Sequence, residues 1–188
     1  YASDSTRCQS EVQQTDASLF TERLTGVWQE CHRVLKGNGL LVFTYHHSRP
    51  EGWRSVLASL HRARFRVVAA HPVKSELSLA TPKRQAREPI DIDIILVCRK
   101  VCAEDCGERV ALEPLMDRAT EQAKAQVQRL RAVGRSLSRN DVQAIFMAQA
   151  IALLSLEREE PVVFELFDAI ESHASGVIEQ LHSTSETT

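Results

Sequence analysis

The sequence has no apolar run long enough to cross a membrane. Its longest apolar stretches lie around Leu40–Tyr45 and Ala144–Leu154, whereas a spanning helix requires about 20 such residues. No succession of charged, apolar and small residues opens the chain in the manner of a secretory signal. Because neither a membrane span nor a secretory signal is evident, we expect a cytoplasmic location. The first residue is Tyr1 and no Met precedes it, which favours a fragment of a longer protein.

Cysteine is scarce and irregularly placed. The chain has five cysteines, an odd number that lacks the dense, even framework of a small secreted domain, so we expect reduced thiols. Cys98, Cys102 and Cys106 recur at four-residue steps, which would align them on a helix. However, Cys98 ends a predicted strand and no histidine lies nearby, so we expect no metal site.

The composition is that of a globular protein with an uneven distribution of charge. With 188 residues, 43% of them hydrophobic and 26% charged, the chain can form one domain or one domain with a small appendage. The net charge is −2, yet residues 48–87 carry nine Lys or Arg against two acidic residues, a net +7. Such a segment can hold a phosphate backbone, and an ordinary solvated arginine-rich surface is the structural alternative.

Hydrophobic periodicity predicts alternating helices and strands in the first half of the chain. Apolar residues at three- and four-residue steps predict a helix over about 18–36, which Gly37 ends. The apolar run 40–45 predicts a central strand covered on both faces. An amphipathic helix after Pro50 leads to a strand at 65–70, which completes a βαβ unit.

After this unit the pattern predicts one more strand and then only helices. Residues 72–89 are too polar and proline-marked for a regular element, whereas 90–97 predict a strand that returns antiparallel. Three helices should follow; Ser138, Asn140 or Asp141 can cap the second, and Pro161 opens the third. The expected divisions are a polar segment at 1–17, half of an α/β domain at 18–100, a helical extension at 101–182 and a disordered tail at 183–188.

The junction between the first helix and the first strand resembles a known family. Arg33–Gly39 reads R-V-L-K-G-N-G, which is similar to the R-V-L-K-P-G-G junction of class I S-adenosylmethionine-dependent methyltransferases. Gly37 replaces the proline and Asn38 the first glycine.

A closer resemblance covers about half of the chain. It is to adenine-specific DNA methylases of bacterial phage-defence and restriction loci. The matching segments are Cys31–Tyr45, the helix at Trp53, the strand from Phe65 with His71-Pro72-Val73 and Glu76, and Ile94–Lys100.

The resemblance implies a fold and a function. The implied fold is a partial Rossmann-like methyltransferase sheet of about three strands, the last one antiparallel, with a C-terminal helical extension. The implied function is that of the C-terminal portion of a DNA adenine-N6 methyltransferase, with DNA and the missing N-terminal half, in cis or on a partner chain, as its partners. S-adenosylmethionine would be the cofactor of the complete protein.

Two elements that the family's chemistry requires are missing from this sequence. They are a glycine-rich cofactor loop after the first strand and an Asp/Asn-Pro-Pro-Tyr/Phe motif. Gly37-Asn38-Gly39 is no substitute, because it follows a helix and opens a strand, whereas a cofactor loop follows a strand and opens a helix. We therefore expect no catalytic residue in this chain and no methylation by this chain alone.

The resemblance also implies which residues could line a target site. Ligands of open α/β sheets lie beyond the carboxyl ends of the parallel strands. Five residues follow two such ends and are candidates for the substrate pocket: Tyr45, His46, His47, Lys74 and Glu76. Tyr45 could stack on a base or belong to the core, and the adjacent histidines should point to opposite sides of the strand.

Three basic residues complete the predicted interface. Lys83, Arg84 and Arg87 lie in the loop after the second strand and could contact DNA phosphates. Two other functions are compatible with the same sequence. One is a fragment of an RNA or small-molecule methyltransferase, and the other is a non-catalytic interaction module that retains half of the fold.

Overall fold

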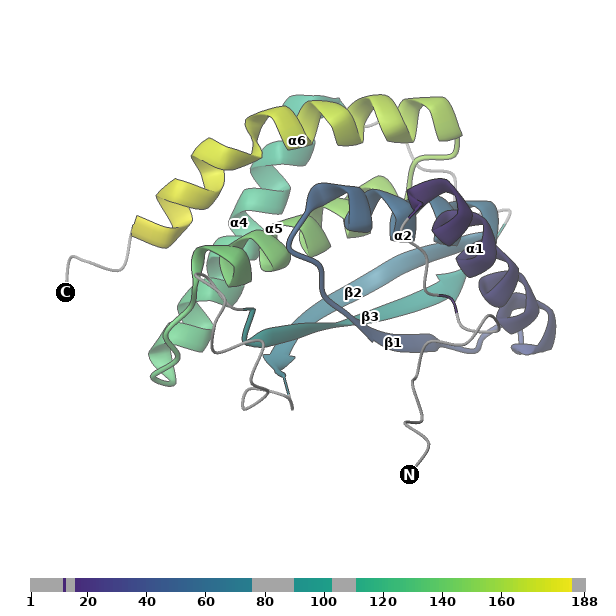
Figure 1. The fold of residues 1–188 in the computed structure, drawn as a ribbon, viewed down its shortest axis with the longest axis horizontal. Helices are drawn as coiled ribbons and strands as arrows, with labels where there is room; N and C mark the ends of the chain where they lie inside the picture. The colour runs from purple at the N-terminus through teal and green to yellow at the C-terminus, as the bar shows by residue number, and fades with distance from the viewer. Residues whose placement is uncertain (1–11, 13–15, 76–89, 103–110, 184–188) are drawn as a thin grey trace.

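A computed structural model describes residue 12 and residues 16–75, 90–102 and 111–183. The candidate residues Glu76, Lys83, Arg84 and Arg87 lie outside these ranges, as does Cys106. The described chain is a mixed α/β structure in which helices lie on one side of a small sheet (Figure 1). In chain order its elements are α1 (Ala17–Val34), β1 (Leu41–Tyr45), α2 (Pro50–Arg62), β2 (Phe65–Lys74), β3 (Ile92–Lys100), α4 (Leu112–Ala132), α5 (Arg139–Leu154) and α6 (Glu160–Ser183).

The sheet has three strands in the order β1-β3-β2. β3 is antiparallel to both neighbours, so β1 and β2 run parallel to each other with β3 between them. The predicted antiparallel return of the last strand is confirmed. Its central position depends on pairing between distant segments and did not follow from the local pattern.

Three elements differ from their predicted boundaries. The strand predicted at 90–97 is β3, which begins at Ile92 and ends at Lys100. β2 continues to Lys74 through Pro72, which lies opposite Ile94. β2 is an edge strand, where the N–H that proline lacks is not needed for a ladder. In addition, α1 ends at Val34 rather than near residue 36, because Leu35 already has an extended backbone (ψ 140°).

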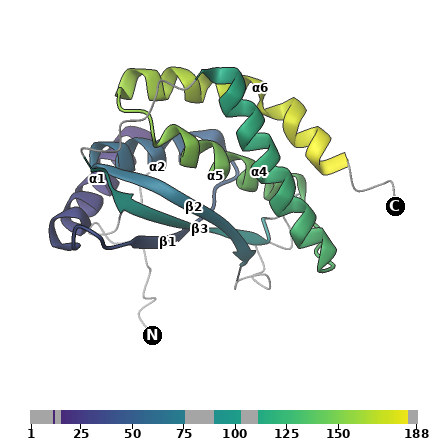
Figure 2. The same ribbon diagram turned by 180° about the vertical axis from the view of Figure 1, so that it is seen from behind.

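The core lies between one face of the sheet and the helices. Trp53 is fully buried and Trp28 is 8% exposed, as expected for core residues. α5 runs between the sheet and the outer helices α4 and α6 (Figure 2). Nearly every α5 side chain is buried, which agrees with its apolar pattern. None of the helices in the described ranges combines the length and apolarity needed to cross a membrane.

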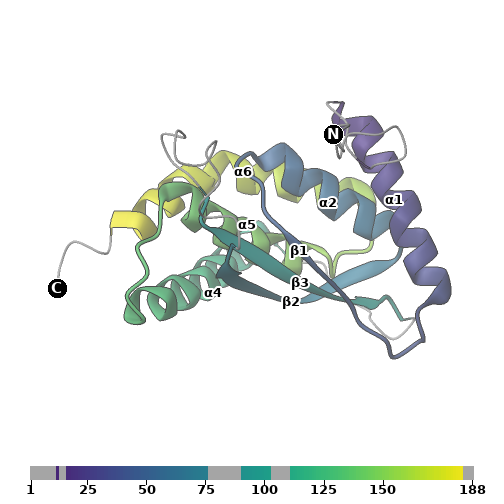
Figure 3. The ribbon, with the colours of Figure 1, turned by 60° about the horizontal axis from the view of Figure 1, so that its bottom comes forward.

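The other face of the sheet carries no described helix (Figure 3). Side chains alternate along β3, so that Ile94 and Leu96 are fully buried on the helix side while Ile95 and Val97 are half-buried on the other. Val42, which pairs with Val97, is 53% exposed. We call this side of the sheet the open face. Within the described residues, the strand expected at 40–45 is therefore neither covered on both faces nor central, because β1 is an outer strand of the sheet.

Candidate functional site

The strand register brings His46 next to Asp93 at the end of the sheet where β1 finishes and β3 begins. Tyr45, the last residue of β1, pairs with Ile94, so His46, which follows it, stands beside Asp93, the second residue of β3. The His46 Nδ1 and Asp93 Oδ1 atoms are in direct hydrogen-bond contact, with side chains 40% and 22% exposed respectively. A carboxylate at Nδ1 orients the imidazole ring and leaves Nε2 as the nitrogen that can meet a substrate.

His47 points to the opposite side and belongs to the loop that enters α2. Its Nδ1 accepts the backbone N–H of Arg49 at 3.0 Å, and its carbonyl accepts the Trp53 indole N–H at 2.9 Å. A Cβ atom at Gly52 would overlap the His47 ring, so the glycine is needed for this ring position. The two adjacent histidines therefore have different partners although neither belongs to β1, and His47 fixes the loop.

Tyr45 lies among aromatic rings on the helix side of the sheet. Its ring meets that of Trp53 edge-on, with centroids 5.1 Å apart and an interplanar angle of 87°. It is nearly parallel to the His47 ring at 6.4 Å. Burial raises the pKa of the Tyr45 phenol above its ordinary value, so this group stays protonated at neutral pH. Tyr45 can offer a ring surface or a hydrogen bond, but not a base.

Lys74 lies at the same end of the sheet, at the end of β2 rather than of β1. It pairs with Ile92 and lines a hollow of about 230 Å³ together with Asp91, Arg135 and Ser136. The lining of this hollow does not include Tyr45, His46 or His47. The structure thus gathers Tyr45, His46 and His47 around the end of β1 and leaves Lys74 at the end of β2.

A buried carboxylate supports this end of the sheet from behind. Asp141 is 1% exposed and accepts the backbone N–H groups of Asp91 at 2.9 Å and Ile92 at 3.3 Å through one oxygen. The other oxygen accepts the N–H of Ser138 at 2.9 Å and completes a capping box at the start of α5. Asp141 therefore fixes the start of β3, and with it Asp93, against α5.

Sequence reasoning missed two residues of this site. Asp93 stands in the alternation Ile92-Asp93-Ile94, which indicates a polar residue on the uncovered face, but its partner depends on the strand register. Gly52 stands in the first turn of a predicted helix, where glycine has no evident local purpose. Only the packing of His47 supplies its reason.

The described cysteines do not form a cluster. Cys98 is buried on the helix side of β3, and burial raises the pKa of its thiol to about 12. Cys102 is exposed beyond the end of the strand. Within the described ranges no three His, Cys, Asp or Glu residues stand close enough together to hold a metal ion.

The glycine turn does not fit a cofactor site. It lies between α1 and β1, at the other end of β1 from His46. The Gly39 N–H donates to the Lys36 carbonyl at 3.0 Å, and a Cβ atom at Gly39 would lie 2.7 Å from Leu35 Cδ1. The turn is thus closed on itself and packed. No described residue is assigned to S-adenosylmethionine.

The two outer edges of the sheet differ. Side chains of neighbouring helices bond to the edge of β2: Ser155 Oγ accepts the Val67 N–H at 2.9 Å, and Gln126 and Gln149 donate to the Ala70 carbonyl at 2.8 and 3.2 Å. Among the described residues no strand or side chain pairs with the outer edge of β1. We call these the closed edge and the open edge.

Comparison with known proteins gives no relative. The chain matches no protein-family model, no curated protein and no solved structure. The geometry of the site and the sequence resemblance are therefore the grounds for assigning a function.

Proposed function

We propose that this chain is the C-terminal portion of an S-adenosylmethionine-dependent DNA adenine-N6 methyltransferase. In this proposal it contributes a wall of the target site and contacts to the DNA backbone. The missing half of the domain, upstream in the same protein or on a partner chain, holds the cofactor, which supplies the methyl group.

The observation that carries the proposal is the open edge of β1. β1 is an outer strand of the described sheet, and Leu40, just before it, and Val42, on its open face, are 46% and 53% exposed, although an apolar run of this kind is typical of an inner strand. A strand with an unpaired backbone edge is a template for further strands. The rest of a larger methyltransferase sheet would pair with this edge and add its strands beyond β1.

The side chains beyond β1 then have a defined position. The carboxyl ends of the parallel strands β1 and β2 lie at the same end of the sheet, and ligands of open α/β sheets bind beyond such ends. His46, held by Asp93 through Nδ1, would offer Nε2 as a hydrogen-bond partner to an extruded base. Lys83, Arg84 and Arg87 would meet the DNA phosphates.

The test is methyl transfer by the chain joined to its missing half. We expect labelled methyl groups from S-adenosylmethionine to reach adenine N6 in DNA. His46→Ala should lower kcat/KM by about 10- to 100-fold, since one hydrogen bond to a charged or polar substrate group is lost. His173→Ala is the matched control, because His173 is exposed on α6 and should leave transfer unchanged.

The substrate and the DNA contacts are tested with the same joined protein. Replacing Lys83, Arg84 and Arg87 by Gln should make DNA binding less sensitive to salt. The slope of log Kobs against log salt should become less negative by about 2 to 3. Transfer to RNA or to a metabolite would instead assign the chain to another methyltransferase class. A stable oligomer that neither binds the cofactor nor transfers methyl groups would contradict the proposal in favour of an interaction module.

A further inference from the structure

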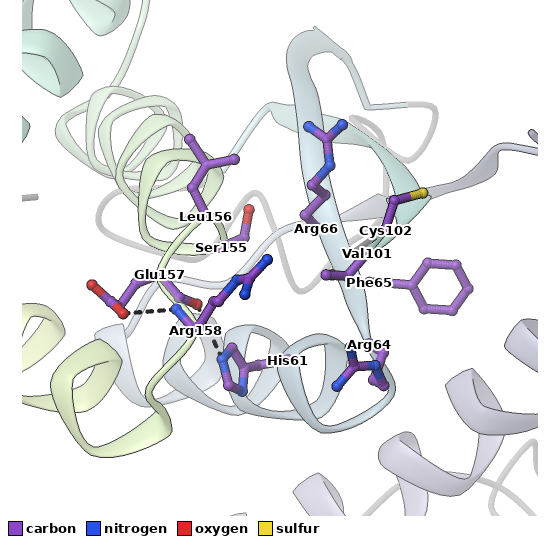
Figure 4. A pocket seen from close by; sticks show the side chains of 10 residues that line it. All are labelled: His61, Arg64, Phe65, Arg66, Val101, Cys102, Ser155, Leu156, Glu157 and Arg158. Atoms are coloured by element: carbon purple, nitrogen blue, oxygen red, sulfur yellow. Dashed lines mark hydrogen bonds between the residues drawn. The ribbon is translucent and has the colours of Figure 1, made fainter. Parts of the chain in front are cut away.

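A second hollow lies at the other end of the strands from His46, where β2 begins and β3 ends (Figure 4). Its volume is about 380 Å³, and it forms where α2 ends, β2 begins, β3 ends and α5 connects to α6. We call it the arginine pocket. The lining residues that matter here are His61, Arg64, Arg66, Val101, Leu156 and Arg158.

The pocket carries a positive charge. Arg64, Arg66 and Arg158 line it, and among the described residues of the lining Glu157 is the acidic one. The Glu157 Oε1 atom accepts the backbone N–H groups of Arg158 at 2.7 Å and Glu159 at 3.1 Å. Figure 4 shows this carboxylate on one side of Arg158 while the Arg158 guanidinium extends to the other, toward the strands. Glu157 thus bonds to the turn that precedes α6, and three arginines belong to the lining of the pocket.

The backbone of Arg64 has an unusual conformation. Its φ is 59°, the left-handed region, and among the described non-glycine residues no other has a positive φ. Helices often end with glycine in this conformation, because an L side chain is disfavoured there. The Arg64 N–H donates to the His61 carbonyl at 3.0 Å, and the Val101 N–H donates to the Arg64 carbonyl at 2.9 Å. The chain therefore holds an arginine at the pocket in a place that favours glycine, and such outliers gather at functional sites.

The positive field extends beyond the pocket. His32 meets the ring of Phe65 edge-on, with centroids 5.4 Å apart. The pKa of His32 is lowered first by burial and then by the charges of Lys100 and Arg64. Burial is the larger cause; the smaller contributions of Lys100 and Arg64 show that these two cations lie near His32 and the pocket residue Phe65.

We propose that the arginine pocket binds a small molecule that bears a phosphate group. The guanidinium groups of Arg64, Arg66 and Arg158 hold the phosphate, since a planar fork of donors matches its oxygens. The half-buried Val101 and Leu156 contact the apolar part of the ligand. The volume of about 380 Å³ lies within the range of small-molecule sites, about 300–1,000 Å³. This pocket is separate from the proposed target site at the carboxyl ends of β1 and β2. The proposal does not depend on the proposed methyltransferase function.

The structural alternative is that the arginines serve only the helices. α2 and α5 both end beside the pocket, and cations stabilise the carboxyl ends of helices. This alternative predicts a loss of stability on substitution and no ligand. Binding and stability must therefore be measured on the same variants.

The experiment is a calorimetric titration of the full chain with pyrophosphate. We expect binding that Arg66→Gln and Arg158→Gln each weaken by at least about tenfold, as the loss of a charged hydrogen bond requires. Arg118→Gln removes the same charge from an exposed position on α4 and should leave the affinity unchanged. No binding, or equal affinity in all four proteins, overturns the proposal. Displacement of pyrophosphate by a short DNA duplex overturns it too, because the arginines would then be contacts to a nucleic-acid backbone.

Arg64→Gly separates binding from folding. Glycine adopts the positive φ of this position readily, so the variant keeps the turn and loses the arginine side chain with its guanidinium. We expect a thermal midpoint equal to or above that of the unmodified chain and pyrophosphate affinity lowered by at least about tenfold. Unchanged affinity in this variant would remove Arg64 from the site and overturn the assignment.

Discussion

The closed edge and the open edge of the same sheet are built from opposite kinds of contact. At β2 the backbone groups of Val67 and Ala70 bond to side chains of α4, α5 and the residue that follows α5. At β1 the outer backbone groups have no partner among the described residues, and Val42 is 53% exposed. Polar side chains that satisfy an edge prevent further strands from adding. The contrast indicates that any continuation of the sheet occurs beyond β1.

The largest expected effect concerns the attachment of α5, the helix that covers the closed edge. Asp141→Ala removes the acceptor of three backbone N–H groups in a buried place. The free energy of unfolding should fall by about 3 kcal/mol, because charged hydrogen bonds are lost and buried donors remain unpaired. Urea denaturation followed by circular dichroism measures this change.

The control for this variant is Asp117→Ala, at an exposed position of α4. It should change the free energy of unfolding by less than about 0.5 kcal/mol. If Asp141→Ala behaved like the control, α5 would not depend on this carboxylate and our account of the closed edge would be wrong.

A smaller effect is expected from the closed edge itself. Ser155→Ala removes the oxygen that accepts the buried Val67 N–H at 2.9 Å. The free energy of unfolding should fall by about 1 to 2 kcal/mol, and the Val67 amide should exchange its hydrogen faster. Ser172→Ala on the exposed surface of α6 is the matched control. Slow exchange at Val67 in the Ser155 variant would mean that the hydroxyl does not close this edge.

The smallest effect on stability is expected at the open edge. Val42→Lys replaces an exposed residue, so the isolated chain should lose less than about 0.5 kcal/mol. The same charge should prevent a strand from pairing with β1, since lysine is a common protection of sheet edges. If the proposed methyltransferase function is right, association of the chain with the N-terminal half of the domain, followed by size-exclusion chromatography, should therefore be lost.

Val133→Lys controls for the added charge, because Val133 is 74% exposed at the end of α4. Normal association of both variants would place the partner elsewhere on the molecule. Loss of association with Val42→Lys alone would identify the open edge as the junction.

Local patterns in the sequence predicted most elements of the fold. Apolar periodicity located α1, α2 and α5, and Ser138 caps α5 as one of the predicted alternatives. The alternation around Ile94 predicted β3 as a strand. The prediction failed at Pro72, because a proline ends a strand only where its missing N–H is required, and that depends on whether the strand is central or at an edge.

The candidate site was predicted only in part. The positions of Tyr45, His46 and His47 after a strand are a local matter, and so is the divergence of the two histidines. The partner of His46 required the register between strands 47 residues apart in sequence. The arginine pocket joins three separate segments of the chain, and each arginine by itself has the pattern of an ordinary surface residue.

The sequence by itself determined the strands, the helices, the cap of α5 and the concentration of basic residues in the middle of the chain, because these depend on side chains that are close along the backbone. Only the tertiary structure decided that β3 lies between β1 and β2, that one sheet edge is closed and the other open, and that Asp93 stands beside His46. These features depend on which distant segments meet. The chain settles that choice by burying the helix-facing side of the sheet against α2 and α5, a global packing that no local pattern contains.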